Sequence, residues 1–407
     1  MKSKFYLSWV VMVTAAIIVI AANTIFIPAM SYIARDLGTD EAAMSSNMVF
    51  SRTSMIICMF CFGAFADLFT SRRLMQAGLV ICTVSCLLSA VSRNIYMFDI
   101  AQVIEAISRA MIMLTMQLWI AGISNKDNLA SRLSWYSILI TMSPILAPSA
   151  GGMIAESASW QYCFIVLGVL CLAMFAGMSV FRIQERTEQR EPSQQKARFA
   201  PMATLREYRR VMAHSPLLPL NFSLLWMAWF DGGFMAIVSF LFVDELGLNA
   251  AELGGIIMIQ VAGIFAGRFP IMYFQKHYGS RITFLYHVAV VLLATSGALC
   301  YRLLTGRQDI IEIAIVIAII GFGSSGMYIY CLRNTMVIEP EKKSVYTSLF
   351  NTLYNVAALL GVLTIQGLYL ADFTSVSIFL TLVGTATVAI LIGTMLHLKS
   401  LQKQIPS

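Results

Sequence analysis

The chain has 407 residues, of which 58% are hydrophobic and only 12% are charged. Soluble domains carry about 25% charged residues, so this composition excludes a soluble enzyme or a soluble binding module of ordinary type. The formal net charge of +7 comes from basic loops between apolar runs, and it gives no reason to expect a nucleic-acid partner.

Twelve apolar runs are long enough to cross a bilayer, which takes about 20 residues in a helix. Membrane strands alternate apolar and polar positions over about ten residues, whereas these runs are continuous. The sequence therefore predicts an all-α integral membrane protein with 12 transmembrane helices in two six-helix bundles. In chain order the predicted spans cover residues 6–28, 46–66, 74–92, 95–122, 133–154, 162–181, 216–242, 252–273, 282–301, 310–336, 345–370 and 374–397.

Lys and Arg residues are divided unevenly between the two sides of these spans. Of the 28, twenty lie on the side of the N-terminus, four lie on the opposite side and four lie inside spans. Cytoplasmic loops carry an excess of basic residues, so both termini are expected in the cytoplasm. The first span lacks a small-residue cleavage site and is expected to remain as an anchor. We expect a multi-pass protein of a bacterial inner membrane.

The longest polar stretch, residues 182–214, divides the spans six and six. We interpret it as a cytoplasmic linker between an N-terminal bundle (1–181) and a C-terminal bundle (215–407). Two equal halves joined by one long inner loop are typical of transporters that rock about a site between parallel repeats.

The loop between spans 2 and 3 runs from Gly63 through Asp67 to Arg72 and Arg73. It resembles the signature loop of the major facilitator superfamily, whose usual form is G-x-L-A-D-R-x-G-R-R. The resemblance implies that Asp67 and Arg72 gate the transport cycle. Three positions depart from that form and predict a weaker or differently connected gate: Leu68, Thr70 and Ser71.

Span 5 is the most specific part of the resemblance. It carries Pro144, Pro148, Gly151 and Gly152, followed by an ending that begins at Trp160. This resembles the proline–glycine motif of the 12-span drug:proton antiporter branch, and it implies that the four residues take part in gating. Prolines remove backbone donors from the helix, and glycines allow a neighbouring helix to approach closely.

Two positions depart from that branch in ways that bear on the substrate. The turn before Pro28 often carries an acid there, but here it carries Asn23. Span 4 usually carries R-x-x-Q-G, but this chain has Gln102, Glu105 and, one turn later, Arg109.

Charged residues inside the spans are the candidates for the transport site, because a charge at the bilayer centre costs roughly 3 kcal/mol on insertion scales. Arg52 lies near mid-depth, where an ion pair between helices and contact with an anionic substrate are equal alternatives. Arg109 and Glu105 are one turn apart, which favours a local pair. Arg268 and Arg333 lie near inner span ends, and Arg333 is grouped with the gating residues.

Asp231 lies near the middle of span 7, followed by two glycines. Burial favours a protonated carboxyl group and a nearby cation favours an ionised one, which is the combination that proton coupling requires. A fixed pair with Arg52 or Arg109 is one alternative for Asp231, and direct contact with the substrate is another. Glu105 is a second candidate for proton coupling, and Trp226 a candidate apolar wall of the substrate site.

No catalytic or metal-binding cluster is evident, and no cofactor is expected. Cys58-x-x-Cys61 has the spacing of a redox or zinc motif, but no further ligands accompany it. The four histidines are dispersed, which disfavours the remote alternative of a membrane-embedded lipid or acyl transferase.

The leading interpretation is a secondary transporter that moves a small organic solute by alternating access, with proton coupling as one alternative. An anionic, polycarboxylate or siderophore-like substrate is slightly favoured by Asn23, Arg52 and Arg109. Multidrug efflux in exchange for protons is the alternative. The expected partners are the solute, protons and the lipid bilayer, and the expected state is a monomer.

Overall fold

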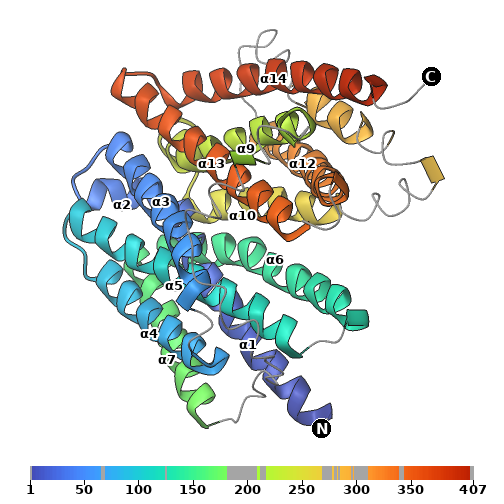
Figure 1. Ribbon diagram of the computed structural model, residues 1–407. Helices are drawn as coiled ribbons and strands as arrows, with labels where there is room; N and C mark the ends of the chain where they lie inside the picture. Colours follow the sequence, from blue (N-terminus) through green and yellow to red (C-terminus); the bar gives the residue numbers. More distant parts are fainter. Residues whose placement is uncertain are drawn as a thin grey trace. The chain divides into compact units, whose positions relative to one another are not determined.

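The chain is described by a computed structural model in which every described regular element is a helix (Figure 1). The described residues are 2–65, 69–123, 126–180, 209–210, 217–267, 277–278, 282, 285–294, 297, 310–338 and 343–403. Each of the twelve predicted spans contains helix within these ranges. Seven described helical stretches are long and apolar enough to cross a membrane on length and composition alone.

The chain forms two compact units. Unit 1 comprises Met1–Phe199 and Phe242–Gly255, and unit 2 comprises Ala200–Leu241 and Ile256–Ser407. Unit 1 therefore contains a short segment from the second half of the sequence. The predicted linker, 182–214, lies outside the described residues except for Arg209 and Arg210, which are exposed.

Unit 1 is arranged around α5, which packs against α3 and α4, while α7 packs on α4 and α6 packs on α1 (Figure 1). Its helices are α1 (Lys2–Ala22), η1 (Ile27–Ala29), α2 (Met30–Asp36), α3 (Glu41–Phe65), α4 (Ser71–Ala90), α5 (Ile95–Ile123), α6 (Lys126–Ser157) and α7 (Trp160–Val180).

The predicted first span is broken between α1 and η1. Pro28 lacks a backbone donor and its ring crowds the preceding turn, so the α-helix ends at Ala22. Four buried aromatic rings fix the chain after the break. Phe26, Phe98, Trp160 and Phe164 pack with ring centroids 5.7 to 6.2 Å apart, which joins η1, α5 and α7.

Unit 2 is arranged around α9, which packs closely on α13 and α14 (Figure 1). A methyl group built on Gly232 would lie 2.1 Å from the carbonyl oxygen of Ala358, and one on Gly361 would lie 2.0 Å from that of Trp229. Glycine is required where two helix backbones approach this closely. The labelled helices are α9 (Leu217–Ser239), the π-helix η3 (Phe240–Glu245), α10 (Ala250–Ala266), α12 (Ile310–Ile338), α13 (Lys343–Leu370) and α14 (Ser375–Lys403).

Candidate functional site

The charged centre of unit 1 is an ion pair on α5. Arg109 Nη2 lies 3.5 Å from Glu105 Oε2, and the two side chains are 7% and 1% exposed. The pair occupies one turn in the middle of the helix, as the sequence spacing predicts. Two buried charges of opposite sign lower each other's cost of burial. The desolvation of both ions still makes the pair no more stabilising than two apolar residues of similar size.

The pair is incompletely hydrogen-bonded by the described residues. Ser51 Oγ on α3 accepts a long, 3.5 Å hydrogen bond from Arg109 Nη2. Both carboxylate oxygens of Glu105 and Nε of Arg109 have no hydrogen-bond partner among the described residues. The carboxyl group of Glu105 therefore keeps hydrogen-bonding capacity that the described residues leave unused.

Small polar groups surround this pair on the α4 side. Ser108 Oγ donates a 2.7 Å hydrogen bond to the carbonyl oxygen of Gly78, where the lack of a side chain lets α4 approach Ile112 of α5. The described residues contain no group of three or more ligands arranged for a metal ion.

Asn23 lies half-buried in the turn that breaks the first span. The turn packs on the predicted proline–glycine motif of α6, since a methyl group built on Gly151 would lie 1.8 Å from the carbonyl oxygen of Ile25. Ser143 of α6 adds a 2.8 Å hydrogen bond to the carbonyl oxygen of Ile17. Irregular backbone is tolerated at membrane depth only where protein or a cavity covers it, and here Gly151 allows α6 to cover it.

The motif in α6 also contacts the segment that unit 1 takes from the second half of the sequence. A methyl group on Gly152 would lie 2.0 Å from the carbonyl oxygen of Ala250, and one on Gly254 would lie 2.5 Å from that of Pro148. Helix α6 continues through Pro144 and Pro148. The prolines thus remove donors without ending the helix, and the glycines provide the close contacts.

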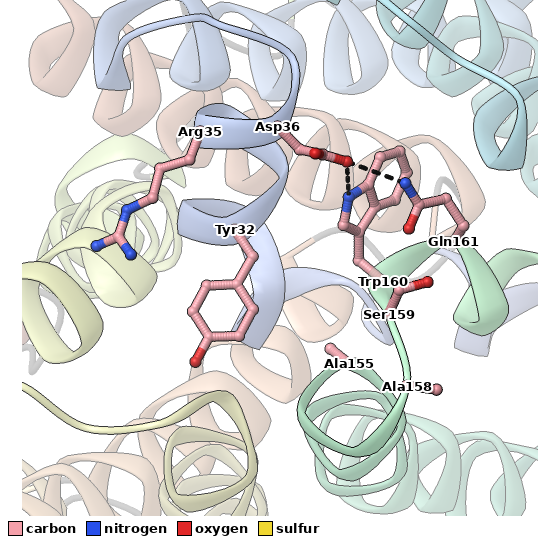
Figure 2. Close-up of a pocket in the computed structure, with 8 residues that line it drawn as sticks. All are labelled: Tyr32, Arg35, Asp36, Ala155, Ala158, Ser159, Trp160 and Gln161. Atoms are coloured by element: carbon pink, nitrogen blue, oxygen red, sulfur yellow. Dashed lines mark hydrogen bonds between the residues drawn. The ribbon is translucent and has the colours of Figure 1, made fainter.

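A pocket of about 700 Å³ opens at the end of unit 1 where α2 meets the junction of α6 and α7 (Figure 2). Asp36 Oδ2 accepts hydrogen bonds of 2.9 Å from Trp160 Nε1 and 3.0 Å from Gln161 Nε2. Tyr32 donates a 2.9 Å hydrogen bond to Glu156. Trp160 and Gln161 belong to the ending of the span-5 motif, so the sequence pointed to this region. It did not indicate that they contact Asp36.

The remaining predicted residues of the N-terminal half lie elsewhere in unit 1. Arg52 is half-buried on α3, next to Ser51, which the sequence did not single out. Arg72 donates hydrogen bonds of 2.7 and 2.8 Å to the carbonyl oxygens of Met178 and Ser179, the last turn of α7. Asp67 lies outside the described residues.

In unit 2, Trp226 and Asp231 are both half-buried on α9. The ring of Trp226 lies 5.1 Å from that of Trp229, which donates a 3.1 Å hydrogen bond to Thr364 of α13. Arg333 belongs to α12, but its side chain lies outside the described residues, as does Arg268.

Known proteins resemble the chain in sequence and in fold. The chain is 28% identical to the quinolone resistance protein NorA of Staphylococcus aureus (strain MSSA476) over 275 residues, which cover 66% of this chain and 68% of that protein. It is 24% identical to multidrug resistance protein D of Escherichia coli (strain K12) over 158 residues, covering 39% and 40%. These relatives confirm the resemblance to the drug:proton antiporter branch.

The solved structure of a bacterial homologue of the human lysosomal transporter Spinster, inward-facing and unoccupied, matches 98% of this chain and 97% of that chain. Its TM-score is 0.74 at 11% sequence identity, so the likeness concerns the fold. It confirms the predicted all-α fold of two six-helix bundles. The family model of the Major Facilitator Superfamily matches residues 12–362. The chain is therefore a multi-pass membrane transporter, not an enzyme, and it belongs to the major facilitator superfamily.

Proposed function

We propose that the chain exports amphipathic drugs without net negative charge in exchange for protons, with zwitterionic quinolones as the first class to test. The relatives that support this proposal are named for resistance to quinolones, to multiple drugs and to bicyclomycin. The single observation that carries the coupling is the buried pair of Glu105 and Arg109, whose carboxylate oxygens have no hydrogen-bond partner among the described residues.

The anionic, siderophore-like substrate expected from the embedded arginines finds no support among these relatives. The structure also gives a physical reason to abandon it for Arg109. Its guanidinium faces Glu105 at 3.5 Å, so its charge is neutralised within the chain and is not available to attract an anion. A neutral pair in a buried site accepts an uncharged or cationic solute more readily than a bare guanidinium does.

Proton binding at Glu105 changes the net charge of the pair from zero to plus one. A buried, uncompensated cation is costly, so the protonated protein favours the conformation in which water or another acceptor reaches Arg109. Release of the proton restores the neutral pair and favours the other conformation. The proton gradient would drive export in this way, by alternating the stability of two states.

Three further residues have roles in this proposal. Asn23, at the break in the first span, would offer an uncharged polar contact to the solute, since broken helices often mark the site in transporters. Trp226 would form an apolar wall and Asp231 would provide a second site for a proton, both on α9. A monomer in a bacterial inner membrane, with both termini in the cytoplasm, completes the proposal.

The test is gradient-driven quinolone uptake into proteoliposomes. The unchanged protein should accumulate quinolone when the lumen is acidic, because protons then leave as the drug enters. Glu105→Gln should lose this gradient-driven accumulation while still binding quinolone in detergent. The double variant Glu105→Gln with Arg109→Gln should also bind quinolone but not accumulate it. Because it leaves no buried charge unpaired, its result separates loss of coupling from loss of folding.

The control is Asp99→Asn, which removes another acid from α5. Asp99 accepts a 2.8 Å hydrogen bond from Asn47 and is only half-buried, so its removal should leave gradient-driven uptake largely intact. Full gradient-driven uptake by Glu105→Gln would contradict the coupling role. Uptake of a dicarboxylate instead of quinolone by the unchanged protein would contradict the substrate class.

A further inference from the structure

Three aromatic side chains of α9, here called the aromatic row, follow one another along the helix: Phe222, Trp226 and Trp229. Their spacing of four and three residues places them on successive turns of one helix face. The ring centroids of Phe222 and Trp226 lie 6.3 Å apart at 60°, and those of Trp226 and Trp229 lie 5.1 Å apart at 70°. These are edge-to-face contacts, an arrangement that aromatic pairs prefer. All three residues are half-buried, so each keeps part of its surface accessible.

Neighbouring helices hold the two ends of the aromatic row. A methyl group built on Gly393 of α14 would lie 2.8 Å from the ring of Phe222, so this ring lies directly against that helix. At the other end, Trp229 Nε1 donates a 3.1 Å hydrogen bond to Oγ1 of Thr364 on α13. Trp226 lies between these two rings and contacts both. The orientation of the middle ring therefore depends on that of its neighbours.

Thr364 meets Trp229 as a hydrogen-bond acceptor. Its hydroxyl donates a 2.8 Å hydrogen bond to the carbonyl oxygen of Leu360, which leaves the oxygen lone pairs for the indole N–H. One turn before Thr364, a methyl group built on Gly361 would lie 2.0 Å from the carbonyl oxygen of Trp229. Because the two helix backbones touch here, the hydroxyl has a fixed place beside the indole. The hydrogen bond then selects one orientation of the Trp229 ring.

A row of oriented, partly accessible rings has a definite binding preference. Indole has the strongest attraction for cations among aromatic side chains, and it acts through the face of the ring. A flat aromatic solute can place its own ring against such a face or edge over its whole length. Rings that are already held in place lose little further freedom when the solute binds. Shape and positive charge in the solute are thus both recognised by the same residues.

We propose that the aromatic row is a subsite for flat aromatic solutes that carry a positive group, and that Thr364 is the positioning residue that sets its selectivity. Thr364 orients Trp229 directly and Trp226 through it. The inference rests on the proposed export of drugs without net negative charge, and it specifies the shape of those drugs.

The experiment measures the dissociation constants of ethidium and tetraphenylphosphonium by equilibrium dialysis with the purified full-length protein in detergent. Each probe carries one positive charge. Ethidium has a flat fused ring system, whereas the rings of tetraphenylphosphonium are arranged around a tetrahedral phosphorus. Thr364→Val keeps a branched side chain and removes the acceptor. It should weaken ethidium binding by about two- to ten-fold, the range expected for one lost hydrogen bond, and leave tetraphenylphosphonium binding nearly unchanged.

Two further variants test whether Thr364 acts through Trp229. Thr364→Ser keeps the hydroxyl and should restore ethidium binding. Trp229→Phe removes the donor of the same hydrogen bond, so combining it with Thr364→Val should weaken ethidium binding no more than the worse single change does. The matched control is Thr385→Val on α14, because the Thr385 hydroxyl donates to the carbonyl oxygen of Thr381 on its own helix. It should leave both dissociation constants unchanged.

The proposal is overturned if the unchanged protein does not bind ethidium, or if Thr364→Val leaves ethidium binding unchanged or weakens both probes equally. Failure of Thr364→Ser to restore binding would overturn the positioning role. Binding in detergent requires no proton gradient, so the result can be separated from that of the uptake assay. A protein that shows this dependence on Thr364 but accumulates no quinolone would contradict the proposed export alone.

Discussion

Glu105 and Arg109 illustrate how a charged residue survives inside a membrane bundle. Each is almost fully buried, and each depends on the other as its ionic partner at 3.5 Å. Desolvation of two ions costs several kcal/mol per ion in practice, so the mutual attraction offsets the cost without yielding a large surplus. Such a pair adds little stability over two neutral residues, which is why we propose a functional role for it.

This balance predicts the stability of three variants. Arg109→Gln leaves the Glu105 carboxylate buried without a cation, and removal of one partner of a buried pair costs about 3–5 kcal/mol. Glu105→Gln leaves the Arg109 guanidinium buried without an anion, at a similar cost. Exchanging both residues for Gln should be nearly neutral, because no buried charge remains. The apparent melting temperature in detergent should therefore be lowered by either single change and largely restored by the double change.

Ser51→Ala is the matched control for this series. Its hydroxyl contacts Arg109 at 3.5 Å, which is too long for a strong hydrogen bond, so its loss should lower the melting temperature only slightly. A double variant destabilised by the sum of the two single effects would show that the two residues act separately.

At this scale the sequence predicted contacts within one helix and missed those between helices. The spacing of Glu105 and Arg109 is enough to predict their pair. The contact of Ser51 with Arg109 depends on how α3 is rotated against α5, which the sequence does not specify. Ser51 is also uncharged, so it was not among the candidates selected by charge inside a span. Asp36 was missed for a similar reason, because Trp160 and Gln161 follow it by more than 120 positions.

Helices α1 and α6 meet where the first span is broken and where Gly151 lacks a side chain. The proline–glycine pattern of α6 predicted close packing, and the structure assigns the contact to the backbone of Ile25. The sequence pattern identifies Gly151 as a site of close packing. It does not identify the backbone segment that packs there. The hydrogen bond between Ser31 and Asp244 could not be predicted either, because the two residues are separated by 213 positions.

We predict that Gly151→Ala disrupts the contact between α6 and α1. The added methyl group would lie 1.8 Å from the carbonyl oxygen of Ile25, and 2.7 Å from its side chain, so backbone must move. Overpacking of this kind costs typically 1–3 kcal/mol, and more where no flexible side chain can yield. The expected result is a lower melting temperature in detergent and slower transport.

Gly177→Ala on α7 is the control for the same chemical change. Nothing lies within 4 Å of a methyl group at Gly177, and alanine favours a helix over glycine by up to about 1 kcal/mol. Gly177→Ala should therefore be neutral or slightly stabilising. Equal behaviour of the two variants would show that the α1–α6 contact at Gly151 is not as close as the structure indicates.

For the whole molecule, hydropathy located the spans well because a bilayer imposes its thickness on every one of them. Each predicted run contains helix in the described residues. The division into two compact units was harder to foresee in detail. Residues 242–255 continue the second half of the chain in sequence but belong to unit 1 by contact. Their composition does not distinguish them from the residues on either side.

The distribution of basic residues leads to a prediction about orientation. In unit 1 the short connections 37–40, 91–94 and 158–159 follow α2, α4 and α6, while α4 and α6 begin with Arg72, Arg73 and Lys126. Because successive helices alternate in direction, the three short connections lie at one end of the bundle and the basic starts of α4 and α6 lie at the other. Because positive charge is retained on the cytoplasmic side, we expect connection 37–40 outside the cytoplasm and both chain termini inside it.

Two reporters with opposite requirements test this orientation in growing bacteria. A fluorescent protein that matures only in the cytoplasm, fused after Ser407, should fluoresce, and an alkaline phosphatase inserted between Gly38 and Thr39 should be active, since that enzyme needs the oxidising space outside. The same phosphatase inserted at residue 125 should be inactive. The opposite pattern would mean that basic loops do not orient this chain, and the proposed direction of proton-driven export would then have to be reversed.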